Sequence, residues 1–173
     1  MSSFQVHRAT ARDLDGLRRL CLDASRDRNG LASARRDPLD PAEWITGRVP
    51  SVVVGEGGEP IGYAAAVPQG IPCGAPRCAE MTIYVAPAQR RRGAARAATN
   101  ELLAVARTMG FWKLLAHAIP EDDAARALLE RFEFREVGVL VKHVQLEGGW
   151  HDVTIHERLL MAARRSVPSP SAG

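Results

Sequence analysis

The chain has 173 residues, of which 46% are hydrophobic and 25% are charged, and these values predict one α/β domain. A domain of this length buries enough surface to fold without disulfides or metals. The formal net charge is +3, from 23 basic and 20 acidic side chains. That excess is small for a protein that binds nucleic acid. No apolar run approaches the ~18 residues that a membrane span requires. We therefore expect neither a nucleic-acid partner nor a membrane partner.

The cysteines and the first residues of the chain indicate the cellular compartment of the protein. Cys21, Cys73 and Cys78 are odd in number and lack the CxxC or Cys/His spacing of a metal site. They are typical of unpaired thiols in a reducing compartment. The first six residues have no basic region followed by an apolar core, which a signal peptide requires. We expect a cytoplasmic protein without a metal.

The N-terminal part of the chain begins with an alternating segment, residues 4–8, that predicts a strand. Thr10 and Asp13 have the spacing of a capping box. After them comes an apolar stripe typical of a core-facing helix, formed by Leu14, Leu17, Cys21 and Ala24. Residues 25–37 are polar and predict a loop. Asp40 and Pro41 then predict the start of a second, short helix, which Trp44 packs against the domain.

The next segments predict three strands and a helix. Residues 51–54 and 61–67 are apolar and flank the glycine-rich segment 55–60, which predicts a hairpin. A Pro/Gly-rich loop, 68–76, follows. Residues 80–85 predict a further strand, and a turn at 86–89 leads into a helix that ends before Gly110.

The start of that helix has the composition of an anion-binding site. The first amides of a helix have no intrahelical partner and carry the positive end of the helix dipole. Gly93, Ala94 and Ala95 have little or no side chain, so a diphosphate can approach the backbone closely. Arg90, Arg91, Arg92 and Arg96 add attraction and forked hydrogen bonds. A solvated charged surface is the other interpretation of such an arginine run.

The C-terminal part predicts one more helix and three strands. Residues 112–119 predict a strand, and Asp122 or Asp123 caps a helix over 124–132. The last two strands are expected at 134–145 and 153–160, joined by the segment 147–152. The final residues, 166–173, are polar and Pro-rich and are expected to be disordered, which leaves one domain over 1–165.

Four motifs carry a family resemblance. The pattern R-x-x-G-x-A at 90–95, after a strand, resembles the acyl-CoA pyrophosphate loop of the GNAT superfamily of N-acetyltransferases. The stretch EMTIYVAP at 80–87 resembles the E-S-T-V-Y-V-x-P stretch of phosphinothricin acetyltransferases. GGWHDV at 148–153 resembles their G-N-W-H-D-V stretch, and PAEW at 41–44 resembles their P-x-E-W helix. The resemblance spans nearly the whole chain.

The resemblance implies a fold and a cofactor. The fold is a mixed, mostly antiparallel central sheet of about seven strands, flanked by about four helices, with a splayed parallel pair ending at Val85 and Ile119. The cofactor is acetyl-CoA, whose pantetheine arm pairs with backbone amides in the splayed region. The residues that the resemblance assigns to cofactor binding are Ile83, Tyr84, Val85, Arg90, Arg91, Arg92, Gly93, Ala94, Ala95, Arg96 and Asp122.

The resemblance also implies a catalytic role for Glu80, which matches the glutamate that acts as general base. The backbone amide of Tyr84 or Val85 polarises the thioester carbonyl. Trp150 and His151 lie near the acceptor, although a structural interpretation, with Trp150 buried and His151 and Asp152 holding a turn, is also open. Arg77 and Lys142 are candidate partners for an acidic acceptor.

The chain departs from the superfamily pattern on the helix after the fifth strand. Leu129 stands where a Tyr or His protonates the leaving thiolate, Glu133 replaces a glycine, and Asp122 replaces an asparagine that contacts the pantetheine. Three explanations are open for the proton. Water supplies it, or another side chain does, or the site is catalytically weak. The candidate side chains are Tyr84, His117 and His143, although a histidine on an apolar strand such as His117 is also typical of a core residue.

The leading interpretation is an N-acetyltransferase that acts on a primary amine of a small amino-acid-like, antibiotic or metabolite acceptor. Its partners are then small molecules. A homodimer is possible because GNAT relatives often dimerise. The alternative is a catalytically silent acyl-CoA-binding regulatory domain, which the leucine at position 129 favours.

Overall fold

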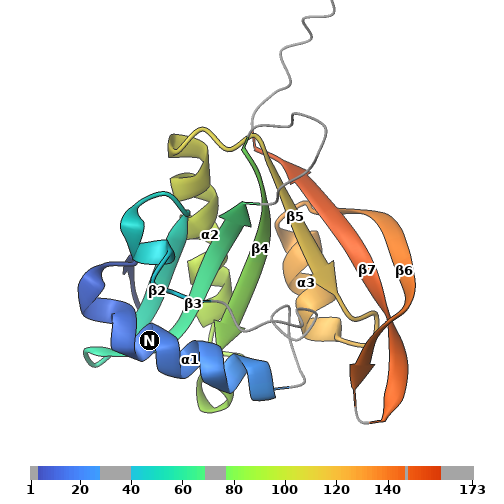
Figure 1. Ribbon diagram of the computed structural model, residues 1–173, viewed down its shortest axis with the longest axis horizontal. Coiled ribbons are helices and arrows are strands. Elements are labelled where there is room, and N and C mark those ends of the chain that lie inside the picture. Colours follow the sequence, from blue (N-terminus) through green and yellow to red (C-terminus); the bar gives the residue numbers. More distant parts are fainter. Residues whose placement is uncertain (1–3, 28–39, 69–76, 147, 161–173) are drawn as a thin grey trace, which may run out of the picture.

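Seven strands form one sheet in the order β1-β2-β3-β4-β5-β7-β6. We describe it from a computed structural model, which covers residues 4–27, 40–68, 77–146 and 148–160 (Figure 1). All neighbouring strands are antiparallel except β4 and β5, which are parallel. The strands are β1 (Gln5–Arg8), β2 (Ser51–Glu56), β3 (Glu59–Pro68), β4 (Cys78–Val85), β5 (Lys113–Ala118), β6 (Arg135–Leu146) and β7 (Gly149–Leu159). The expected mixed seven-stranded sheet is confirmed.

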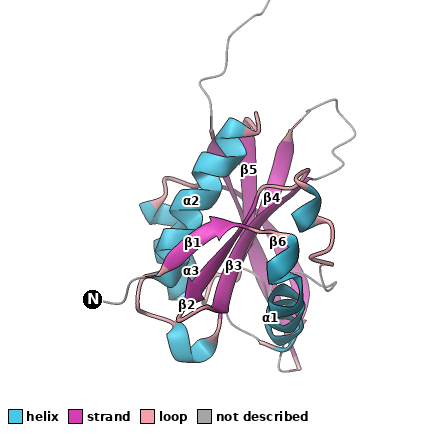
Figure 2. Ribbon diagram, turned by 90° about the vertical axis from the view of Figure 1, so that its left-hand side faces the viewer, coloured by secondary structure: helices cyan, strands magenta, loops and turns pink. Residues whose placement is uncertain are grey.

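The helices lie on both faces of the sheet. Figure 2 shows α2 (Ala94–Thr108) and α3 (Asp123–Arg131) on one side and α1 (Leu14–Arg26) on the other. The described residues contain these three α-helices, not the expected four. The helix expected from Asp40 is a turn followed by a single 3-10 turn, Trp44–Thr46. It stops there because Gly47 adopts a left-handed conformation, with φ of 78°. None of the described helices is long and apolar enough to cross a membrane.

Strand β4 is the centre of the sheet, and all eight of its residues are buried. Side chains alternate between the two faces of a strand. Met81, Ile83 and Val85 therefore pack into the core beneath α2, whereas Tyr84 packs with Tyr63 in the core beneath α1. The same alternation puts Glu80 on the α1 face, within the strand. The sequence placed Glu80 at the start of this strand, but the strand begins two residues earlier.

The parallel strands β4 and β5 form a fork. Their pairs run from Cys78–Lys113 to Met81–Ala116, which is the last one. Strand β4 nevertheless continues to pair with β3 on its other side as far as Val85, opposite Gly62. The end of β4 therefore has one edge without a pair to β5. This is the splayed parallel pair that the sequence predicted.

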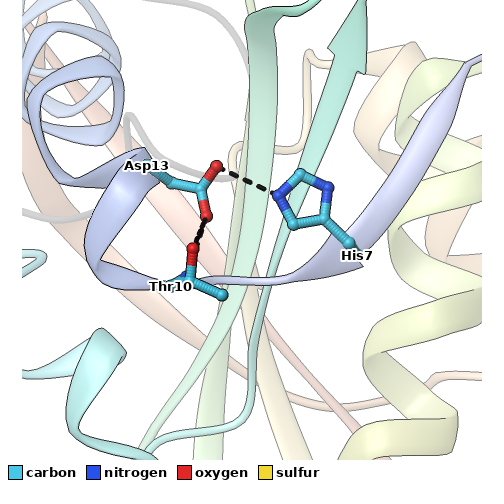
Figure 3. Close-up of polar contacts among 3 residues, drawn as sticks. All are labelled: His7, Thr10 and Asp13. Atoms are coloured by element: carbon cyan, nitrogen blue, oxygen red, sulfur yellow. Dashed lines mark hydrogen bonds and ion pairs between the residues drawn. The ribbon is translucent and has the colours of Figure 1, made fainter.

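The turn before α1 is held by a side-chain network (Figure 3). One oxygen of the Asp13 carboxylate accepts hydrogen bonds from the amide and the hydroxyl of Thr10, at 2.8 and 2.7 Å. The other oxygen lies 3.0 Å from Nε2 of His7. Burial on its own would raise the pKa of Asp13, but the hydrogen bonds from Thr10 and His7 outweigh it and lower that pKa. The capping box predicted at these two positions is confirmed.

Several sequence expectations fall on residues outside those described. They are residues 28–37 of the loop expected over 25–37, residues 69–76 of the loop expected over 68–76, the disordered tail over 166–173 and the domain boundary at 165. Residues 25 and 26 belong to α1, and Pro68 ends β3.

Candidate active site

The first turn of α2 begins at a glycine, and no side chain caps its amides. Gly93 is the N-cap, with φ of 94° and ψ of 2°, and as a glycine it has no side chain to cap the helix. No described atom lies within 4 Å of the position that a Cβ would take there. The first intrahelical bond runs from the amide of Ala97 to the carbonyl of Gly93. The preceding amides of the first turn are thus available to an anion, as the diphosphate of CoA requires.

The four arginines around this helix start divide into two kinds. Arg90 forms an ion pair with Asp27, and its Nε donates to the carbonyl of Val85 at 3.0 Å. Arg92 makes two bonds to the carboxylate of Glu56, at 3.0 and 2.6 Å. These two side chains tie the loop to α1 and to the β2–β3 hairpin, respectively.

Arg91 and Arg96 are exposed and make no ion pair with any residue in the described ranges. Arg91 also adopts a left-handed conformation, with φ of 62°. Of the four arginines expected at the diphosphate, these two are therefore the ones whose guanidinium groups are not already bound to a carboxylate. The side chains of Ala94 and Ala95 pack toward the core, so a ligand at this helix start would meet only their backbone.

The three residues expected to bind the pantetheine arm have different surroundings. Ile83 and Val85 have their side chains in the core beneath α2. Tyr84 is 4% exposed and lies beside Tyr63 with a ring centroid distance of 6.1 Å. Burial raises the pKa of Tyr84, which keeps its hydroxyl protonated. Any contact with the pantetheine from Ile83 and Val85 must come from the backbone, on the edge that β5 does not pair.

Glu80 lies at the narrow end of the fork, next to the last pair of β4 and β5. Its Oε1 is 3.1 Å from Nδ1 of His117 on β5. The glutamate side chain is 11% exposed and the histidine side chain 22% exposed. Both point to the α1 face, since their sequence neighbours Met81 and Ala116 point into the core beneath α2. The sequence indicated both residues as candidates, but not that their side chains lie in contact.

The helix positions that depart from the superfamily pattern have structural roles. Leu129 is 1% exposed in the core beneath α2, so it is a packing residue. Oδ1 of Asp122 accepts the amide of Ala125 at 2.9 Å and caps α3. Glu133 has φ of 56°, the left-handed conformation that suits a glycine. None of these observations supplies a proton donor.

The W-H-D stretch lies in β7 and not in the connecting turn that the sequence predicted. The last pair between β5 and β7 is Ala118–Thr154, so Trp150, His151 and Asp152 extend past the end of β5. Trp150 is 57% exposed, so the alternative interpretation in which its side chain is buried is wrong. Nδ1 of His151 is 3.9 Å from Oε2 of Glu121, and Asp152 accepts the amide of Lys142 at 2.7 Å. Asp152 thus has the structural role, and Trp150 has an accessible ring.

Three further candidates lie away from Glu80. Arg77 precedes β4 at the end opposite the fork opening, and its guanidinium donates to the carbonyl of Met109. Lys142 and His143 are exposed at an irregular part of β6, which is separated from β5 by β7. The structure therefore does not bring these side chains together with Glu80.

A second charged cluster lies on the same face as Glu80 and was not predicted from the sequence. Nζ of Lys113 is 2.9 Å from Glu157, which is also paired with Arg135. The hydrogen bond from Lys113 lowers the pKa of Glu157. No sequence signal could have indicated it, because the three residues come from three different strands.

The arrangement of a glycine-capped helix beside a forked parallel strand pair defines a class, that of acyl-CoA-binding transferase folds. A model of the acetyltransferase (GNAT) family matches residues 15–134. The chain belongs to this family and is an acetyl-CoA-dependent N-acyltransferase. No curated protein matches the chain by sequence.

Solved structures of similar fold cover nearly the whole chain. A phosphinothricin acetyltransferase from Sinorhizobium meliloti, in complex with AcCoA, has 26% sequence identity and a TM-score of 0.79, and the match covers 99% of this chain and 96% of that one. A ribosomal-protein-alanine N-acetyltransferase from Brucella melitensis has 28% identity and a TM-score of 0.77, with 90% and 99% covered. The yncA protein of Salmonella typhimurium, with its cofactor acetyl-CoA, has 20% identity and a TM-score of 0.80, with 98% and 99% covered. The last comparison supports the fold alone.

Proposed function

We propose that this enzyme transfers the acetyl group of acetyl-CoA to the primary amine of a small amino-acid-like, antibiotic or metabolite acceptor. The observation that carries the proposal is the position of Glu80, a buried carboxylate at the narrow end of the fork. Amines are mostly protonated near neutral pH, so the acceptor must lose a proton before its nitrogen can attack. A carboxylate beside the thioester meets that need. The likeness to the Sinorhizobium meliloti enzyme supports an amino-acid-like acceptor.

Different groups of the chain bind the cofactor and carry out the reaction in this proposal. The amides at the start of α2, with Arg91 and Arg96, hold the diphosphate, and the free edge of β4 holds the pantetheine arm. Acetyl-CoA supplies the activated acyl group. The negative charge of Glu80 draws the proton from the acceptor amine, and the amide of Tyr84 or Val85 stabilises the carbonyl oxygen as charge develops on it.

Two further aspects follow from the described side chains. Trp150 and His151 extend past the end of β5, and we propose that they contact the acceptor. Cys21 and Cys78 are free and buried, which suits a reducing compartment, so we propose that the reaction takes place in the cytoplasm.

The test is a thiol-release assay with acetyl-CoA and a panel of primary amines that includes phosphinothricin and the common amino acids. Glu80→Gln keeps the size of the side chain and removes its charge. We expect it to lower kcat by about 100-fold or more, the usual contribution of a general base. Acetyl-CoA affinity, measured by calorimetry, should stay at the wild-type value.

A silent acyl-CoA-binding domain remains the second candidate, because Leu129 is a buried apolar residue where the superfamily has a proton donor. That candidate predicts tight binding of acetyl-CoA without turnover of any amine in the panel. Turnover that Glu80→Gln leaves unchanged would instead refute the role of the carboxylate.

A further inference from the structure

The contact between Glu80 and His117 joins two strands at the point where they separate. Met81 and Ala116 form the last pair of the parallel ladder, and Glu80 and His117 flank that pair. Their side chains meet on the face away from α2 and α3, with 3.1 Å between Oε1 and Nδ1. The imidazole therefore lies where the fork begins to open.

The chemistry of the two groups fixes how they share a proton. An ionised carboxylate only accepts hydrogen bonds, so Nδ1 of His117 carries the hydrogen toward Glu80. In a neutral imidazole this leaves Nε2 as a proton acceptor. The side chain of His117 is also twice as exposed as that of Glu80, at 22% against 11%. The imidazole is thus the more accessible member of the pair, and the carboxylate is the more buried one.

We infer that His117 is the proton carrier of this site and that Glu80 orients it and stabilises its charged form. A buried carboxylate that holds one imidazole nitrogen, so that the other can take and return a proton, is the arrangement of Ser-His-Asp hydrolases. The inference rests on the proposed function. It refines the catalytic role of Glu80, whose negative charge acts through the imidazole. His117 also supplies a proton donor from β5, in place of the one that the superfamily has at the position of Leu129 on α3.

The proton balance of the step is simple. The ammonium form of the acceptor first loses one proton to the Glu80–His117 pair, which releases it to solvent. The neutral amine nitrogen then forms a bond to the carbonyl carbon of the thioester, and its second proton passes to Nε2 of His117. When the carbon–sulfur bond breaks, the electron pair stays on sulfur, and His117 returns the proton to that sulfur. The products are the acetylated amine, free CoA and a neutral imidazole.

Other titratable groups face this pair, and they must be considered in a pH profile. On the same face lie Cys78 and Tyr84 of β4, Lys113 of β5, Glu157 of β7 and Arg135 of β6. Burial raises the pKa of both Cys78 and Tyr84. Lys113 and Arg135 both form ion pairs with Glu157. His156 lies behind the pair on the opposite face, and burial lowers its pKa.

Substitution of His117 by asparagine tests proton transfer separately from the hydrogen bond to Glu80. An asparagine amide can take the place of Nδ1 and donate to Glu80, but it cannot accept a proton near neutral pH. We expect His117→Asn to lower kcat by about 100-fold or more. We also expect it to remove one limb of the profile of kcat/KM against pH, because asparagine does not titrate. His117→Gln serves as a second variant, and His143→Ala, on the exposed part of β6, is the matched control.

Calorimetry with acetyl-CoA shows whether each variant keeps the binding site. Unchanged affinity together with lost turnover supports the inference. If His117→Asn keeps wild-type kcat and the same pH limb, Glu80 acts without the imidazole and the inference is wrong, while the proposed function stands. If the wild-type enzyme acetylates no amine in the panel, both are wrong.

Discussion

Replacement of Gly93 by alanine tests whether the backbone at the start of α2 holds the diphosphate. The substitution adds one methyl group at a residue with φ of 94°. In the protein itself that methyl group has room, because no described atom lies within 4 Å of its position. Its cost to the free protein is therefore the left-handed conformation alone, about 1–2 kcal/mol for an L-residue.

The cost to binding is separate and comes from the ligand side. A diphosphate that lies against the amides of the first turn approaches the backbone closely, and the new methyl group stands in front of those amides. We expect the Kd for acetyl-CoA to rise at least about tenfold, which corresponds to about 1.4 kcal/mol. The loss of stability should lower Tm by about 2–8 °C, on a scale of 2–4 °C per kcal/mol for a domain of this size.

Gly47→Ala is the matched control. Gly47 has φ of 78°, and no described atom lies within 4 Å of its Cβ position. It follows the Trp44–Thr46 turn, outside residues 90–96 at the start of α2. Thermal unfolding should show a similar loss of stability for both variants, whereas calorimetry should show weaker acetyl-CoA binding only for Gly93→Ala. Equal affinity in the two variants would refute the reasoning, because it would mean that the ligand does not approach this backbone.

Four other substitutions follow from the described residues. Arg91→Ala should weaken acetyl-CoA binding about fivefold or more at low salt, and less at high salt, whereas Arg92→Ala, which breaks the pair with Glu56, should chiefly lower Tm. Asp13→Asn should cost about 1 kcal/mol of stability at pH 7. Folding lowers the pKa of Asp13 from its ordinary 3.8, so the difference from wild type in acid melts should disappear as the pH falls below that value. Glu133→Gly should raise stability by about 1 kcal/mol through relief of its left-handed conformation, with kcat unchanged.

The sequence predicted the elements that carry the site because their signals are local. The hydrophobic alternation of 80–85 and the glycine and small residues of 93–95 each lie within one short stretch, so they can be interpreted without the rest of the fold. The helix expected from Asp40 failed for an equally local reason. Asp40 does accept the amide of Ala42, at 2.9 Å, but Gly47 and the following strand leave room for only one turn.

The carboxylate partners of Arg90 and Arg92 could not be predicted, because they are distant in the sequence. Arg90 meets Asp27 across 63 positions and Arg92 meets Glu56 across 36. A run of arginines shows only that positive charge is present at a helix start. Which guanidinium groups are held by carboxylates and which face a ligand depends on how α1 and the β2–β3 hairpin pack beside the loop.

The pairing of Glu80 with His117 depends on the register of two parallel strands, which no local pattern determines. A shift of one residue in β5 would turn His117 toward the core beneath α2, where Ala116 and Ala118 now lie. In that register the histidine would be a buried core residue, which was the ordinary interpretation of a histidine on an apolar strand. The observed register places it against a buried carboxylate at the fork instead. The fold thus places a packing leucine at position 129 of α3 and an imidazole at position 117 of β5, beside Glu80.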